Sequence, residues 1–119
     1  MERLKITTPT GLYRIPTEFI AYIQASGNYS NLHLVNGEEV TLTFQLHHFE
    51  DAIGKLRKKS LVRIGRSLIV NKNYVLSINI NSQELRLIDY KLGNSFKLKV
   101  SKDALRELKT MLDQEPDEL

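Results

Sequence analysis

The feature that most constrains the fold is a series of short segments in which apolar and polar residues alternate. Alternation with a period of two is typical of strands that bury one face. Such segments occupy residues 11–15, 19–24, 31–35, 39–44, 61–64, 73–80, 84–90 and 95–100. Residues 67–70 also have strand character, as a short apolar run. A chain of 119 residues has the length of one domain, and its 41% of apolar residues can supply a core. We therefore predict a single mainly β domain.

The residues between these segments predict specific turns. Asn36-Gly37 predicts a hairpin with a type I′ turn, in which both central residues have positive φ. The sequence KLGN at residues 91–94 predicts a second hairpin, and NSQ at residues 81–83 predicts a turn.

Two further segments have a helical period. Their apolar faces consist of Leu46, Phe49, Ala52, Ile53 and Leu56 in the first, and of Leu105, Leu108 and Leu112 in the second. This spacing predicts two short helices. We expect Thr43 and Ser101 to be their N-caps, and the cations of residues 57–59 to lie at the C-terminal end of the first.

Charge is unevenly distributed along the chain. The net charge is +3, but residues 113–119 form an acidic tail with four acids and no base. Residues 52–83 contain no acid and seven bases, which are Lys55, Arg57, Lys58, Lys59, Arg63, Arg66 and Lys72. Such a segment can be the footprint of a polyanion, or simply a solvated surface with uneven charge.

Several classes of protein are disfavoured. The chain has no cysteine, no apolar run of the roughly 18 residues that span a membrane, and no signal peptide at its start. We therefore expect a cytoplasmic protein without a membrane partner. His47 and His48 are adjacent rather than four residues apart, and His33 is distant in sequence. With no paired carboxylates in strand-end loops and no glycine-rich phosphate motif either, we expect no enzyme, no metal and no cofactor.

Three longer segments together resemble a known family. They are FIAYIQASGNYSNLHL (19–34), LVRIGRSLIVNKNYVLSI (61–78) and KLKVSKDALRELKTML (97–112). In this order they resemble the LytTR-type DNA-binding domain of bacterial transcriptional regulators, over about residues 10–112. The most specific parts are GNYS after a strand and VRIGRSLIVN.

The resemblance implies an elongated, mostly antiparallel fold of several sheets, with about eight to ten short strands and two short helices. It also implies that loops at the sheet edge enter successive major grooves of double-stranded DNA. Two copies, as a homodimer on DNA, would bind repeated half-sites. Family members usually carry a receiver or sensory domain ahead of this region. None fits before residues 1–4, so we expect either a fragment of a longer regulator or a stand-alone version.

The resemblance also implies contact positions in three places. They correspond to Asn28, Tyr29, Ser30 and Asn31 after a strand, to Arg63, Gly65, Arg66 and Ser67 in the RS bend, and to Lys99, Ser101 and Lys102 before the last helix. Two positions depart from the family pattern. Gly65 replaces a frequent histidine, and Lys102 replaces a frequent arginine, so the target sequence cannot be carried over.

The RS bend raises a physical question. The alternation of Val62 and Ile64 would place Arg66 on the core face, where an unpaired guanidinium is costly. We expect Gly65 to bend the strand, so that Arg66 points outward to guanine O6 and N7. Arg63 would stay on the solvent face and bind phosphate. The alternative is an ordinary bulge with a solvated arginine.

The other two places have simpler alternatives. Residues 28–31 can be only a turn, and Tyr29 can be a packing anchor for it. Ser101 can be only a helix cap, whereas Lys99 and Arg106 can bind phosphate.

Two hypotheses from different classes follow. The first is sequence-specific DNA binding as the output module of a transcription regulator. The second is a small β protein-interaction module that binds a partner by edge-strand pairing, independently of Arg66 and of salt.

Overall fold

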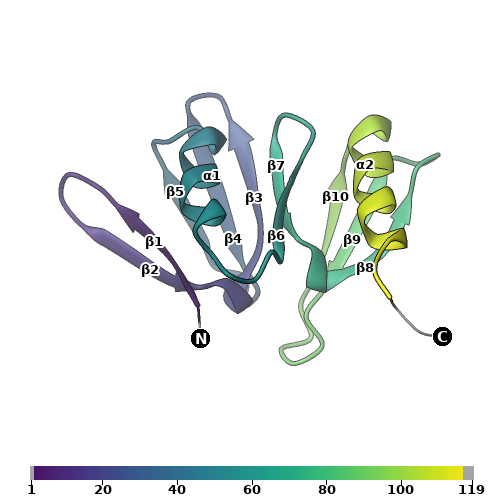
Figure 1. The fold of residues 1–119 in the computed structure, drawn as a ribbon, viewed down its shortest axis with the longest axis horizontal. Coiled ribbons are helices and arrows are strands. Elements are labelled where there is room, and N and C mark those ends of the chain that lie inside the picture. Colours follow the sequence, from purple (N-terminus) through teal and green to yellow (C-terminus); the bar gives the residue numbers. More distant parts are fainter. Residues whose placement is uncertain (1, 117–119) are drawn as a thin grey trace.

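The computed structural model describes residues 2–116, which form an elongated, mainly β fold with extents of 45 × 31 × 26 Å (Figure 1). The strands are β1 (Arg3–Thr7), β2 (Leu12–Pro16), β3 (Ile20–Ser26), β4 (Tyr29–Leu34), β5 (Glu39–Leu42), β6 (Leu61–Ile64), β7 (Leu68–Asn71), β8 (Val75–Asn79), β9 (Glu84–Ile88) and β10 (Ser95–Lys99). The helices are α1 (Leu46–Gly54) and α2 (Lys102–Asp113), with the 3-10 turns η1 (Thr17–Phe19) and η2 (Lys72–Tyr74). The predicted fold class is confirmed.

The strands of the described part form three antiparallel sheets. Their orders are β1-β2, β5-β4-β3-β7-β6 and β10-β9-β8. The middle strands of the five-stranded sheet are buried on both faces: Leu68 and Val70 of β7 face one core, and Ile69 faces the other. This explains why residues 68–71 are all buried and why LIVN does not alternate.

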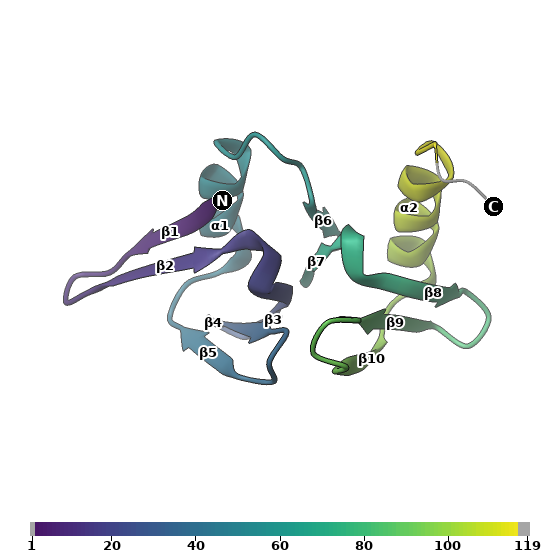
Figure 2. The ribbon, with the colours of Figure 1, turned by 90° about the horizontal axis from the view of Figure 1, so that it is seen from below.

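Each core is closed by one helix and one small sheet. The first combines Leu4 of β1 and Phe49 of α1 with Ile69. The second combines Leu87 of β9 and Leu105 of α2 with the opposite face of β7. Figure 2 shows β6 and β7 between the half that contains α1 and the half that contains α2. The β6–β7 hairpin therefore lies where the two halves meet.

The strand β1 was not predicted. Its sequence RLKIT alternates, with Leu4 and Ile6 buried and the other three side chains exposed. It pairs with β2, and this hairpin covers α1 and the first core. Its alternation includes only two apolar side chains, and the pairing with β2 that makes it a strand is a tertiary contact and not a local property.

Two local predictions were wrong in detail. Residues 36–37 do connect a hairpin, but only Gly37 has positive φ (95°), so the turn is not type I′. Instead, Leu34 O accepts from Gly37 N–H at 3.0 Å, and a left-handed glycine then closes the hairpin. The N-cap of α1 is Gln45 rather than Thr43, and it makes no side-chain cap bond.

The ends of the helices differ in how well they were predicted. Ser101 caps α2 as expected, since its Oγ accepts from Ala104 N–H at 3.3 Å. The helix α1 ends at Gly54, earlier than expected, but Lys59 Nζ still donates to Gly54 O at 3.0 Å.

The acidic tail is partly structured. Asp113 belongs to α2, and Glu115 pairs with Lys72 of η2, whereas residues 117–119 lie outside the described residues. Within residues 2–116, no helix is long and apolar enough to cross a membrane.

Candidate nucleic-acid interface

The three predicted contact segments lie along one edge of the molecule. This edge, at the top of Figure 1, carries the β3–β4 tip, the β6–β7 turn and the N-terminus of α2. Residue pairing explains the first two: Gln24 pairs with Leu68, and Ala25 N–H donates to Ser67 O at 2.9 Å. The turn and the start of α2 share a hollow of about 90 Å³, whose lining includes Gln24, Arg66, Ser67, Lys99 and Ser101. We call this edge, with its three segments, the recognition edge.

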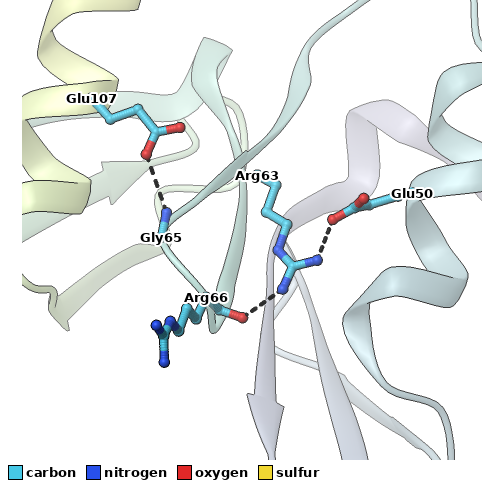
Figure 3. A network of polar contacts seen from close by, with 5 residues as sticks. All are labelled: Glu50, Arg63, Gly65, Arg66 and Glu107. Carbon is cyan, nitrogen blue, oxygen red and sulfur yellow. Dashed lines mark hydrogen bonds and ion pairs between the residues drawn. The ribbon is translucent and has the colours of Figure 1, made fainter.

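The β6–β7 turn consists of Gly65, Arg66 and Ser67. Gly65 has a φ of 60°, a region that residues with a Cβ rarely adopt. A Cβ there would also lie 3.1 Å from the Cβ of Ala104 in α2. The chain reverses at Gly65 rather than continuing as a bulged strand, and Arg66 is exposed at the tip. Its guanidinium has no hydrogen-bond or ion-pair partner within residues 2–116 (Figure 3).

Arg63 is placed differently from what the sequence suggested. Its guanidinium pairs with Glu50 of α1 and donates to Arg66 O at 2.8 Å (Figure 3). Only 33% of the side chain is exposed. Arg63 is therefore less solvated than the sequence suggested, and two of its five N–H donors are used within the fold. A phosphate contact through its remaining donors stays a prediction.

The β3–β4 tip carries two exposed candidates and one buried one. Gly27, with a φ of 62°, makes the turn, while Asn28 and Tyr29 are exposed. The Ser30 side chain is completely buried, and its hydroxyl donates to Phe44 O. Ser30 therefore fastens β4 to the segment before α1, and we remove it from the candidate contacts.

Asn31 lies one residue further along β4. Its Oδ1 accepts from the hydroxyl of Thr41 at 3.0 Å, on the exposed side of the β4–β5 ladder. Its amide nitrogen has no hydrogen-bond partner among residues 2–116 and can still donate to a ligand.

The N-terminus of α2 combines exposed cations with free backbone donors. Lys99, Ser101 and Lys102 are all exposed. The first turn of a helix has N–H groups without intrahelical partners, which favour an anion there. Arg106, which the sequence suggested as a further phosphate contact, pairs with Asp103 at 3.2 Å and remains exposed.

Sequence reasoning missed three residues at the recognition edge. Gln24 lines the hollow, Glu50 pairs with Arg63, and Glu107 Oε2 lies 3.4 Å from the Gly65 amide nitrogen. The two glutamates belong to exposed faces of helices, where acids are ordinary. No pattern in the sequence distinguished them, because their partners are 13 and 42 residues away.

A family model described as the LytTr DNA-binding domain matches residues 10–113. The chain belongs to the LytTR family. A solved LytTr DNA-binding domain, from a methyl-accepting/DNA response regulator of Bacillus cereus, is similar in structure. The TM-score is 0.63 at 22% identity, and the match covers 94% of this chain and 97% of that one. A search of curated proteins gave no match.

As a LytTR domain, the chain is a DNA-binding domain with a role in transcription regulation. The structural similarity, at this low identity, shows that the fold is the same. The LytTR match begins at residue 10 and therefore does not include β1. Leu4 of β1 nevertheless packs in the same core as α1.

Proposed function

We propose that this LytTR domain reads duplex DNA by sequence, as the output module of a bacterial transcription regulator. The β6–β7 turn and the β3–β4 tip would enter successive major grooves, and two copies would occupy repeated half-sites as a homodimer on DNA. The observation that carries the proposal is that the β6–β7 turn brings Arg66, and the start of α2 brings Lys99 and Lys102, to one edge. None of these three side chains has a hydrogen-bond or ion-pair partner among residues 2–116. The similar solved domain belongs to a response regulator, which supports a receiver or sensory domain in the full regulator.

Each segment has a distinct chemical role in this proposal. Arg66 reads a guanine, because a guanidinium can donate to O6 and N7 together. Lys99 and Lys102 bind phosphate, aided by the α2 N-terminus. The remaining contacts are polar groups that can reach base edges or phosphates, namely Asn28, Tyr29, Asn31, Ser67 and Ser101.

The test is DNA binding at several salt concentrations, with two duplexes. One duplex is selected from a random library by the protein itself, and the other has the same composition in scrambled order. With the phosphates at Lys99 and Lys102 neutralised in each copy, log K should fall with log salt with a slope of about −2 or steeper. The selected duplex should bind more tightly at every salt concentration, with two protein copies on a two-site duplex.

Two results would contradict the proposal. A salt-independent affinity would show that the protein neutralises no phosphates, and it would favour a protein-interaction module that pairs an edge strand with its partner. Equal affinity for both duplexes would leave DNA binding without sequence reading.

A further inference from the structure

We infer that Glu50 and Arg63 are positioning residues, which hold the β6–β7 turn so that Arg66 has one orientation at the recognition edge. The inference rests on the proposed function, since it concerns how sequence is read. It assigns a role in DNA recognition to an acidic residue on α1, which lies outside the three predicted contact segments.

The Arg63 guanidinium connects the turn to the helix. One of its terminal nitrogens pairs with the Glu50 carboxylate, and the other donates to Arg66 O at 2.8 Å (Figure 3). A guanidinium is planar and rigid, so both contacts are fixed relative to each other. The position of the Arg66 carbonyl is thereby set by α1. This helix packs in the first core, whereas α2 packs in the second.

The two flanking residues of the turn are fixed by other elements. On one side, Gly65 packs against Ala104 of α2, and its N–H points to Glu107 Oε2 at a long distance of 3.4 Å. On the other side, Ser67 O accepts from Ala25 N–H of β3 at 2.9 Å. Gly65 and Ser67 thus have contacts outside the hairpin, whereas Arg66 O is linked to α1 only through Arg63 of β6.

Such restraint matters more for specificity than for stability. The Glu50 and Arg63 side chains are 47% and 33% exposed, and partly exposed ion pairs add little to the free energy of folding. Two hydrogen bonds to one guanine, in contrast, require the Arg66 backbone to be correctly oriented. A carboxylate near DNA also repels phosphate, so its benefit must come from the geometry that it maintains.

The experiment compares Glu50→Ala with Asp51→Ala. Both substitutions remove one negative charge from the exposed face of α1, but of these two described carboxylates only that of Glu50 pairs with Arg63. Both variants should bind the scrambled duplex somewhat more tightly than the unsubstituted protein. Only Glu50→Ala should lose discrimination between selected and scrambled duplexes, by roughly tenfold, the size of coupling expected within one polar network.

A double-mutant cycle with Arg63→Gln distinguishes positioning from direct contact. If Arg63 acts through its pair with Glu50, the double variant should discriminate no worse than either single variant. Additive losses would instead assign Arg63 to an independent phosphate contact and overturn the inference. In the free protein, NMR should show greater mobility of the Arg66 amide in Glu50→Ala than in Asp51→Ala.

The outcomes separate this inference from the proposed function. If the unsubstituted protein does not discriminate, sequence reading itself fails. If it discriminates and the Glu50→Ala and Asp51→Ala variants do so equally well, only the positioning role fails.

Discussion

Arg63 and Arg66 are three residues apart on one hairpin, yet their guanidinium groups lie in different environments. Arg63 is held by Glu50 and by a backbone carbonyl, whereas Arg66 is exposed and unpaired within residues 2–116. An arginine at a hairpin tip without an acidic partner is available to a base edge or a phosphate. This difference makes Arg66 the residue to test first.

The first prediction compares Arg66→Ala with Lys99→Ala. Loss of a bidentate guanine contact should cost about 1–3 kcal/mol at one base pair and relax the preference there. Lys99→Ala should weaken binding evenly across sequences and make the salt slope less steep by about one. Binding titrations against single-base variants of the selected duplex measure both. If both substitutions weaken binding uniformly, Arg66 is a phosphate contact.

The second prediction compares two glycines by urea unfolding. Gly65→Ala should lower the free energy of unfolding by about 1–2 kcal/mol, because a left-handed φ is unfavourable for alanine. The added Cβ would also crowd Ala104 at 3.1 Å. Gly54→Ala is the control: it lies in α1 with nothing within 4 Å of the new Cβ, and should stabilise by about 0.5–1 kcal/mol. Equal effects would mean that the β6–β7 turn does not require its glycine.

At the scale of elements, β1 shows how a short segment contributes to a distant helix. It supplies Leu4, with no exposed surface, to the core of α1. The Glu2 carboxylate also accepts from the backbone N–H groups of Arg57 and Lys58 at 2.7 and 2.8 Å. These bonds lower the pKa of Glu2 and tie the start of β1 to the loop after α1.

The third prediction concerns this strand. Leu4→Ala should destabilise the protein by about 2–5 kcal/mol, the range for a buried leucine that leaves a cavity. The neighbouring exposed substitution Lys5→Ala should change the free energy of unfolding by less than about 0.5 kcal/mol. Denaturant titrations of both variants provide the measurement. A small effect of Leu4→Ala would indicate that β1 is not docked in solution.

At the scale of the whole molecule, Tyr22 joins two sheets. Its ring stacks on His33 at 4.2 Å between centroids and meets Phe96 of β10 edge-to-face at 5.6 Å. Burial lowers the pKa of His33 below its usual 6.5, and the Glu39 carboxylate acts in the opposite direction. The neutral imidazole is therefore the form that the folded protein favours.

The fourth prediction is a pH dependence of stability. As the pH falls, His33 takes up its proton at a higher pH in the unfolded chain than in the folded protein, because folding lowers its pKa. The contribution of His33 is thus complete above about pH 6.5 and decreases as the pH falls through its lowered folded pKa. His33→Phe keeps a ring against Tyr22 and should show a smaller loss of stability between about pH 7 and pH 5. Identical pH profiles for the two proteins would show that His33 stays equally protonated in both states.

The sequence by itself determined the elements and several of their ends. Nine of the strands, both helix faces and the Ser101 cap follow from residues that are neighbours along the chain. A period of two or of 3.6 residues is a local property, and so is a side chain that caps an amide three residues later. The candidate contacts Arg66, Lys99 and Lys102 were also predicted from the resemblance, and they are exposed.

Only the tertiary structure decided which candidate contact residues lie together and which already bond to other groups within the fold. The order β5-β4-β3-β7-β6 brings the β3–β4 tip beside the β6–β7 turn, and the second core brings α2 to the same edge. Ser30 is buried and donates to Phe44 O, and Arg63 pairs with Glu50 of α1. These partners are 13 or 14 residues away, so their approach depends on the packing of sheets and helices and not on any local sequence pattern.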